Sequence, residues 1–410
     1  MLKARSVNPV VMKDLNVFLV QNCIYKKGPI SRIDIAAEID ASAATVSRVV
    51  EALLQKNIVK NAGIIETNSV GRKAELLEFN YDYGTIVGLY IRERRIDIAL
   101  ANLRGQIIAK DHVSNKNIVK TTDYLDLICN LIKNIINKST VKNLLTISVS
   151  CFGWVDTGKG KILQSLLMPQ LKDLPLKQVL ESQFHVPVSV ENDVNMAAIG
   201  EYSFYKNQDI HNLAYIEFGL GIGAGMIVEG KLYRGYASGA GELAYCLPDE
   251  SNLYEDKRER GCLSAIIGLD AVEKKLEAAN IPELSGIARG IPSLEKMMEL
   301  YQQGHFFLRR LIDEVIDKMA LAVCNYSCIL NPQIIVIGGD YADAWGDFLL
   351  NRLRLAVENS YPLAPSIRAS ACDEFPELIG AIETALTQGI NIIRESGKSS
   401  ADIEDTMRYL

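Results

Sequence analysis

The stretch Leu213 to Val228, LAYIEFGLGIGAGMIV, decides the fold class of this 410-residue chain. Two runs of strand-forming apolar residues flank a series of glycines between Phe218 and Gly225. Glycines at this spacing allow a tight turn between strands, and they also allow backbone amides to approach a phosphate. Without its surroundings the motif does not separate these two interpretations.

Strands and helices alternate on both sides of the glycine run. Before it we expect strands at 85–91, 96–103, 106–109, 144–150 and 186–190, with helices at 123–137 and 176–183. After its second strand, at 223–228, we expect a helix at 306–329 and a strand at 334–337. This alternation predicts α/β layers. Because the order of elements nearly repeats, two related lobes are expected.

The first 80 residues follow a different pattern, in which capping residues mark three helices. Asn8-Pro9 opens the first helix, Ser31 the second and Ser42 the third. Apolar residues recur on one face of each, and they include Met12 in the first helix and Ile33 in the second. Strands at 58–66 and 73–79 follow, separated by a polar turn. Three helices and a β-hairpin predict a winged helix-turn-helix.

Small and polar residues at the start of the third helix suit close approach to a DNA major groove. Residues 1 to 80 carry 11 basic and 8 acidic side chains, whereas the whole chain has a net charge of −6. A protein-interaction domain of the same shape is the alternative. The predicted DNA-binding residues are Arg32, Ser42, Ala44, Thr45, Ser47, Arg48, Gly71, Arg72 and Lys73.

Whole-chain composition excludes several classes of protein. Hydrophobic residues make up 48% and charged residues 23%, which is typical of a soluble globular protein and disfavours a disordered one. No apolar run approaches the ~20 residues of a membrane span, and the amino-terminal stretch lacks a secretion signal. The 8 cysteines are scattered without metal-ligand spacing. We therefore expect a cytoplasmic protein that does not enter the membrane.

Two further motifs place polar side chains near strand ends. Glu191-Asn192-Asp193-Val194-Asn195 follows a predicted strand, and the carboxyl ends of strands form the usual ligand edge of α/β sheets. The alternative is a polar helix cap. Gly239-Ala240-Gly241-Glu242, followed by Tyr245, would by itself indicate only a surface loop.

Taken in order, these motifs and Ile337-Gly338-Gly339 resemble the ROK family of repressors, open reading frames and sugar kinases, over residues ~8 to 390. The resemblance implies an α/β, actin-like, two-lobed sugar-kinase fold behind the winged helix-turn-helix of the family's regulator branch. It implies three units: 1–80 for DNA binding; 81–192 for the first lobe, with a helix at about 375–395 returning to it; and 193–374 for the second lobe.

The first departures from the family pattern lie in the two loops that bind phosphate in the family's kinases. Family kinases carry Asp-x-Gly-Gly-Thr after the first strand, whereas this chain has the turn Arg92-Glu93-Arg94-Arg95. Without the glycines the backbone cannot wrap a nucleotide phosphate. Leu220 also stands where the second glycine loop usually has threonine. We therefore expect that ATP does not bind and that the chain is not an enzyme, because phosphoryl transfer depends on positioning and electrostatics.

The family's zinc segment is altered as well. Tyr245 replaces its histidine, and Glu255 and Lys257 replace two of its cysteines, which leaves Cys262 alone. A single thiolate cannot form a tetrahedral structural site, so zinc is expected to be absent. Ser264 stands where the family has a sugar-contacting glutamate. The resemblance carries over a reduced set of sugar-binding residues: Gly153, Asn192, Asp193, Glu242 and Tyr245.

The resulting hypothesis is a sugar-responsive transcriptional regulator, a repressor of carbohydrate-use genes, whose kinase-like cleft binds a sugar without phosphorylating it. Its expected partners are double-stranded operator DNA, a sugar or sugar derivative, and a second copy of the chain or a higher homo-oligomer. Two alternatives stay open. One is an active sugar kinase, and the other is a DNA-binding dimer whose large domain serves as a scaffold without sensing anything.

Overall fold

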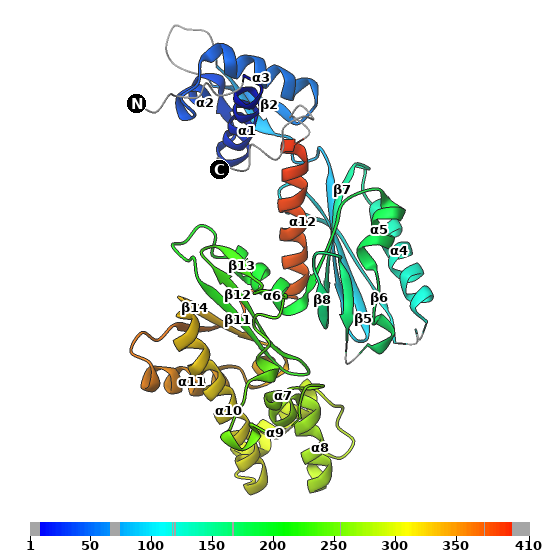
Figure 1. Ribbon diagram of the computed structural model, residues 1–410, viewed down its shortest axis with the longest axis vertical. Coiled ribbons are helices and arrows are strands. Elements are labelled where there is room, and N and C mark those ends of the chain that lie inside the picture. Colours follow the sequence, from blue (N-terminus) through cyan, green and yellow to red (C-terminus); the bar gives the residue numbers. More distant parts are fainter. Residues whose placement is uncertain are drawn as a thin grey trace.

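The computed structural model describes residues 9–65, 74–116, 118, 120–165, 168–254, 256–372 and 374–395. The chain forms an elongated molecule with its amino-terminal unit at one end (Figure 1). The elements of that unit are α1 (Pro9–Lys27), β1 (Ile30–Ser31), α2 (Arg32–Glu38), α3 (Ala43–Gln55), β2 (Val59–Ile65) and β3 (Ala74–Phe79). The three strands form an antiparallel sheet in the order β1-β3-β2.

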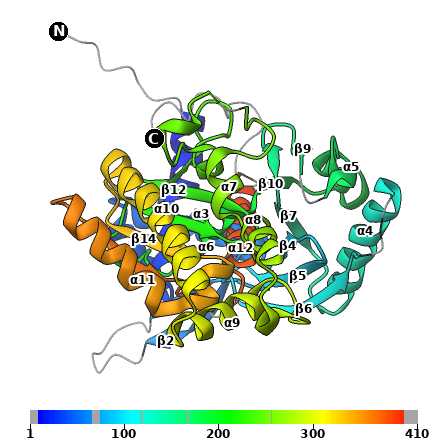
Figure 2. The ribbon, with the colours of Figure 1, turned by 90° about the horizontal axis from the view of Figure 1, so that it is seen from below.

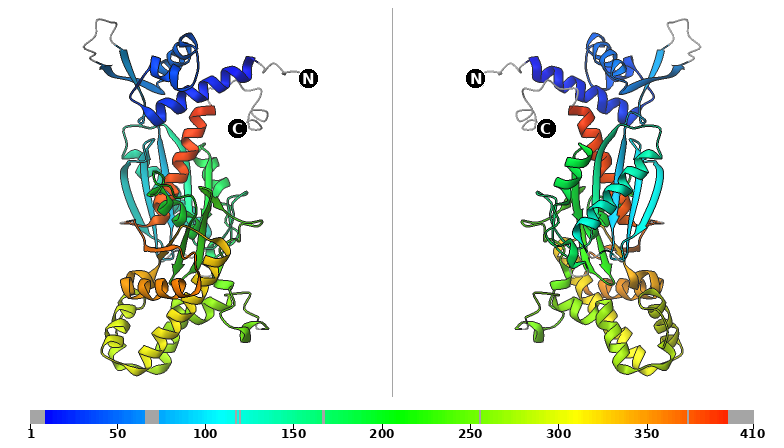
Figure 3. Two further views of the ribbon diagram at one scale, coloured as in Figure 1. Left: turned by 90° about the vertical axis from the view of Figure 1, so that its left-hand side faces the viewer. Right: turned by 90° about the vertical axis from the view of Figure 1, so that its right-hand side faces the viewer.

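The core of this unit differs from the predicted one at two positions. Met12 is 46% exposed, because the beginning of α1 projects past the other helices (Figure 3). Ile33 is 72% exposed, whereas Ile35 is fully buried. Residues two apart on a helix do not share a face, so the two isoleucines cannot both point inward. Val20 and Ile24 supply the buried face of α1 instead.

The first lobe is built on a five-stranded sheet of order β10-β7-β4-β5-β6. Strands β10, β7 and β4 are parallel, β5 pairs antiparallel with β4, and β6 pairs antiparallel with β5. Its elements are β4 (Thr85–Ile91), β5 (Arg95–Asn102), β6 (Ile107–Ser114), α4 (Thr121–Asn137), β7 (Leu144–Cys151), β8 (Trp154–Asp156), β9 (Lys161–Gln164), η1 (Pro169–Leu171), α5 (Leu176–Phe184) and β10 (Val188–Asn192).

The second lobe repeats this pattern in a sheet of order β13-β12-β11-β14-β15, with β11, β14 and β15 parallel. Figure 2 shows β12 and β14 of this sheet from below. Its strands are β11 (Leu213–Phe218), β12 (Ile222–Val228), β13 (Lys231–Tyr233), β14 (Ile334–Gly338) and β15 (Ser366–Ala369). Its helices are α6 (Asp193–Ser203), η2 (Leu243–Tyr245), η3 (Glu250–Asn252), α7 (Cys262–Ile267), α8 (Leu269–Ala279), η4 (Pro282–Leu284), α9 (Ile291–Gln302), α10 (Phe306–Leu330) and α11 (Asp340–Ser360), which is kinked at Gly346.

Helix α12 (Pro376–Glu395) joins the parts of the molecule (Figure 1). It crosses α6 where glycines leave room: a Cβ on Gly380 would lie 1.8 Å from the Met196 carbonyl oxygen, and one on Gly200 would lie 2.1 Å from that of Pro376. At its other end, the Arg394 guanidinium donates a 2.8 Å hydrogen bond to Asn22 of α1. One hydrophobic cluster correspondingly runs from α1–α3 through α12 to the first sheet. Within the described residues, no helix is long and apolar enough to span a membrane.

Candidate functional site

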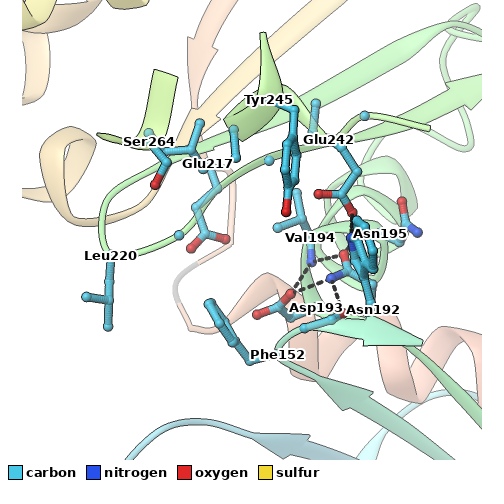
Figure 4. Close-up of a pocket in the computed structure, with 18 of the residues that line it drawn as sticks. Phe152, Asn192, Asp193, Val194, Asn195, Glu217, Leu220, Glu242, Tyr245 and Ser264 are labelled. Atoms are coloured by element: carbon cyan, nitrogen blue, oxygen red, sulfur yellow. Dashed lines mark hydrogen bonds between the residues drawn. The ribbon is translucent and has the colours of Figure 1, made fainter. Parts of the chain in front are cut away.

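A cavity of about 410 Å³ lies in the cleft between the lobes. All five residues predicted to bind sugar line it: Gly153, Asn192, Asp193, Glu242 and Tyr245. They come from the turn between β7 and β8, the end of β10, the start of α6, the loop before η2 and η2 itself, and Figure 4 shows most of them around one space. The glycine run between β11 and β12 forms part of the same wall.

Asn192 is the N-cap of α6, as the helix-cap alternative supposed. Its side-chain oxygen accepts hydrogen bonds from the amides of Val194 and Asn195, at 3.0 and 3.2 Å. Its side-chain amide donates to the Gly153 carbonyl at 3.1 Å and to the Asp193 carboxylate at 3.0 Å. Both donors and both acceptor positions are therefore occupied within the protein. Asn192 orients Asp193 and ties the first lobe to the helix.

Asp193 presents a free carboxylate oxygen. Its Oδ1 accepts hydrogen bonds from the Val194 amide and from Asn192, whereas no hydrogen bond reaches its Oδ2 from the described residues. The side chain is only 3% exposed, and burial raises the pKa of Asp193 to about 7, with the nearby Glu242 carboxylate also raising it. A sugar hydroxyl could donate to Oδ2 and replace the water that burial has excluded.

Glu242 is held from across the cleft by Trp154, a residue that was not predicted. The indole Nε1 of Trp154, in β8, donates a 2.8 Å hydrogen bond to Glu242 Oε1. Burial raises the pKa of Glu242, and this hydrogen bond opposes the shift. The Trp154 ring is 45% exposed and lines the cavity. Its position directly after Phe152-Gly153 was the only signal in the sequence, and it does not reveal the partner.

Tyr245 lines the cavity and also anchors a neighbouring loop, and its predicted contact with a sugar stays a prediction. Its hydroxyl donates a hydrogen bond to the Arg258 carbonyl oxygen at 3.2 Å. Its ring lies 6.0 Å from that of Trp154, centroid to centroid. Tyr245 therefore contributes an aromatic wall and anchors the loop that contains Arg258.

A second cavity, of about 890 Å³, shares Phe152, Asp193, Glu217, Leu220 and Gly221 with the first. It lies beside the turn after β4, at which the family pattern has its phosphate-loop glycines. Arg92 fills the position of the missing glycines there. Its guanidinium donates to Asp97 at 3.0 Å and lies 3.9 Å from the centroid of the Phe375 ring.

The second glycine loop is also filled by this chain. The Leu220 amide, which would face a phosphate, donates a 2.9 Å hydrogen bond to Asp340 Oδ2. A Cβ on Gly219 would lie 2.3 Å from the same oxygen, so the carboxylate is packed tightly against the loop. Asp340 thus occupies the loop's anion position, and the residues present do not fit a nucleotide phosphate.

In the described part of the chain, no group of three or more histidine, cysteine, aspartate or glutamate side chains is arranged to hold a metal ion. Cys262 is buried, and Glu255 lies outside the described residues. The arrangement gives a structural zinc ion no visible set of ligands, and the predicted absence of zinc stays a prediction.

The predicted DNA-binding residues divide into three groups. Ala44 and Arg48 are exposed on α3, and Ser47 is half-buried there. Ser42 and Thr45 bond to each other through their hydroxyls at 2.9 Å, and Arg32 pairs with Glu75 of β3 at 2.9 Å. Gly71, Arg72 and Lys73 lie outside the described residues.

A family model described as the ROK family matches residues 86–383. The chain therefore belongs to the ROK family, as its motifs predicted. It is similar to a xylose repressor from Caldicellulosiruptor bescii, with 29% identity over 359 residues that cover 85% of this chain and 89% of the relative.

Solved structures show the fold. A ROK family transcriptional regulator, homologous to the E. coli Mlc protein, aligns with a TM-score of 0.76 at 22% identity, covering 94% of this chain and 99% of that one. A ROK hexokinase from Thermus thermophilus aligns with a TM-score of 0.62 at 22% identity, covering 74% and 98%. The mixed α/β, sugar-kinase-like fold is thereby confirmed.

Proposed function

We propose that this chain is a DNA-binding transcriptional regulator, a repressor, whose operator affinity changes when a sugar occupies the 410 Å³ cavity. One observation carries the proposal. Polar side chains from both lobes line the sugar cavity, while Arg92 and Asp340 fill the neighbouring positions at which a kinase would hold phosphate. The similarity to proteins named xylose repressor and ROK transcriptional regulator supports it.

The amino-terminal unit supplies the DNA-binding part of the proposal. Helices α2 and α3 and the β2–β3 hairpin follow one another in the order of a winged helix-turn-helix, in which α3 enters the major groove. Arg48 is exposed near the start of α3, where it can reach a base edge or a phosphate. The units 1–80, 81–192 with 375–395, and 193–374 are proposed as DNA-binding domain, first lobe and second lobe.

Helix α12 provides a physical route from the cleft to the DNA-binding unit. Its first turn contains Glu377, which lines the second cavity, and its last turn contains Arg394, which contacts α1. The close crossing at Gly380 leaves α6 and α12 little room to slide past each other. A sugar that binds a closed arrangement of the lobes better than an open one would shift both helices together.

In a homodimer, such a shift would change the spacing of two recognition helices relative to two operator half-sites. The proposed partners are therefore operator DNA, a sugar and a second copy of the chain, in the cytoplasm. We propose no ATP, no zinc and no catalytic activity. An active sugar kinase and a non-sensing scaffold are the outcomes that would replace this proposal.

The test is fluorescence anisotropy of the full chain on DNA from upstream of its own and neighbouring genes, at two salt concentrations, with a panel of sugars that includes xylose. Specific binding released by one sugar supports the proposal. Arg48→Ala should weaken specific binding at least ~10-fold, with Lys13→Ala on α1 as the control. Specific binding that no sugar changes favours the scaffold, and sugar-dependent ATP consumption in a coupled assay favours the kinase.

A further inference from the structure

The amino-terminal unit meets the large domain where the end of α12 lies beside α1 (Figure 1). The Arg394 guanidinium, in the last turn of α12, lies 5.4 Å from the centroid of the Phe18 ring and 6.0 Å from that of the Tyr25 ring, both in α1. It also donates a 2.8 Å hydrogen bond to the side chain of Asn22 in the same helix. We call these four residues the α1–α12 joint.

A second arginine of the large domain holds the linker that follows the amino-terminal unit. Arg104, in the turn between β5 and β6, lies 5.1 Å from the centroid of the Tyr81 ring. The Tyr81 ring packs beside those of Tyr25 and Phe79, with centroids 6.1 and 5.4 Å away. The Tyr81 carbonyl oxygen accepts a 3.0 Å hydrogen bond from the Leu103 amide. Two guanidiniums of the large domain therefore hold one group of aromatic rings, and each such contact is attractive.

Gln21 opposes this attraction. It lies on the same face of α1 as Phe18 and Tyr25, because it is three and four positions away from them. Its side chain is only 1% exposed, and neither its amide nitrogen nor its amide oxygen has a hydrogen-bond partner in the described part of the chain. A buried amide without partners has lost its hydrogen bonds to water and gained none in return. Separation of α1 from α12 would give water access to this amide.

We propose that Arg394 is a positioning residue that orients the amino-terminal unit for operator binding, and that the sugar acts by releasing the α1–α12 joint. This inference rests on the proposed function, because it describes how the same repressor responds to its sugar. A docked unit holds its recognition helix in a fixed place, whereas a released unit loses conformational freedom when it binds DNA. The docked state therefore binds the operator more tightly, and a sugar that favours the released state lowers this affinity.

Two substitutions should move this equilibrium in opposite directions. Arg394→Ala removes the hydrogen bond to Asn22 and the ring contacts, so it favours the released state. Gln21→Met nearly keeps the shape of the side chain but removes the unpaired amide, so it favours the docked state. Arg309→Ala is the control, because Arg309 makes the same kind of contact in the second lobe, 5.7 Å from the centroid of the Tyr301 ring.

Hydrogen–deuterium exchange on the full chain, without DNA or sugar, measures the docking equilibrium directly. Exchange is compared on the helix that does not carry the substitution. In Arg394→Ala the amides of α1 should exchange at least ~3-fold faster, and in Gln21→Met those in the last two turns of α12 should exchange at least ~3-fold more slowly. Arg309→Ala should match the parent in both helices.

Fluorescence anisotropy on operator DNA then separates positioning from general damage. Arg394→Ala should weaken sugar-free binding about 3- to 10-fold, toward the affinity of the sugar-saturated parent, and leave the sugar-saturated affinity unchanged. Gln21→Met should strengthen binding in saturating sugar by a similar factor. Calorimetry without DNA should show tighter sugar binding in Arg394→Ala and weaker binding in Gln21→Met, because the coupling between the two ligands is reciprocal. A merely structural role for Arg394 would weaken sugar-free and sugar-saturated DNA binding equally.

The outcomes distinguish this inference from the proposed function. If both variants match the parent in exchange and in operator affinity while a sugar still releases the operator, the joint plays no part and the proposed function stands. Equal weakening of sugar-free and sugar-saturated DNA binding in Arg394→Ala also overturns the positioning role. If exchange shifts as expected but no sugar changes operator binding, the sugar response fails, and with it the release of the joint by sugar. Absence of specific DNA binding by the parent overturns both.

Discussion

The cavity around Asp193 and the cavity around Arg92 share a wall but use their polar groups differently. In the first, carboxylate oxygens such as Asp193 Oδ2 receive no hydrogen bond from the described residues. In the second, the guanidinium of Arg92 packs on the Phe375 ring, and the carboxylate of Asp340 accepts a hydrogen bond from the Leu220 amide. The difference teaches that, beside the missing glycines, side chains of this chain already bond to the groups that would face a phosphate; the absence of ATP binding stays a prediction.

The largest effect should come from breaking the sugar cavity. Asp193→Ala removes the free carboxylate oxygen, so we expect at least ~100-fold weaker sugar binding and no sugar-dependent release from DNA. Affinity for operator DNA without sugar should stay within ~2-fold of the parent, because α6, the helix that begins at Asp193, lies far from α3 (Figure 1). Anisotropy with and without sugar measures both. Normal induction in this variant would show that the site has been misassigned.

The second-largest effect concerns the free energy of unfolding and comes from Glu377, which lines the second cavity. Burial raises the pKa of Glu377 from 4.5 to about 8. Between these values the folded protein retains a proton that the unfolded chain has released, so stability falls as pH rises from about 5 to 8. Glu377→Gln removes this loss and should stabilise the protein by about 1–3 kcal/mol at pH 8.5, but hardly at pH 5.

Urea unfolding at several pH values provides the measurement for Glu377→Gln. The exposed Glu374→Gln serves as the control and should give a curve parallel to that of the parent. If Glu377→Gln also gives a parallel curve, the carboxyl of Glu377 titrates normally in the folded protein.

The third prediction concerns Arg92, which lines the second cavity. Arg92→Ala loses the hydrogen bond to Asp97 and the contact with the Phe375 ring, and should destabilise the protein by about 1–2 kcal/mol. Sugar affinity should not change. Arg94→Ala, whose ion pair with Glu93 is exposed, should have little effect on urea unfolding. Gain of ATP binding in Arg92→Ala would contradict the view that Asp340 and the lost glycines also exclude the nucleotide.

The smallest effect should come from the contact across the sugar cavity. Trp154→Phe keeps an aromatic ring but removes the donor to Glu242, so sugar affinity should fall about 3- to 10-fold. The chain has 2 tryptophans, and the other, Trp345, is buried in the second lobe. Sugar binding should therefore change the fluorescence of Trp154 in the parent, and the change should vanish in Trp154→Phe. Unaltered affinity would mean that the hydrogen bond from Trp154 to Glu242 does not contribute to sugar binding.

Much of this architecture follows from local patterns. The strand predicted at 85–91 is β4, and the helix predicted at 306–329 is α10. Both could be predicted because each element is buried along its whole length, and this burial produces a regular pattern of apolar residues. The five predicted sugar-binding residues also line one cavity. Whether they bind sugar stays a prediction, and so do the roles of the α3 residues.

The amino-acid sequence by itself determined the order of strands and helices, the ROK family and the absence of phosphate-loop glycines. Only the tertiary structure decided what replaced those glycines and how the polar groups pair. Trp154 meets Glu242 from 88 positions away, and Leu220 meets Asp340 from 120 positions away. The first contact joins the two lobes and the second joins the ends of two paired strands within the second lobe, and local propensity carries no information about either. The hydrogen bond from the Tyr245 hydroxyl to the Arg258 carbonyl oxygen was likewise visible only in the tertiary structure.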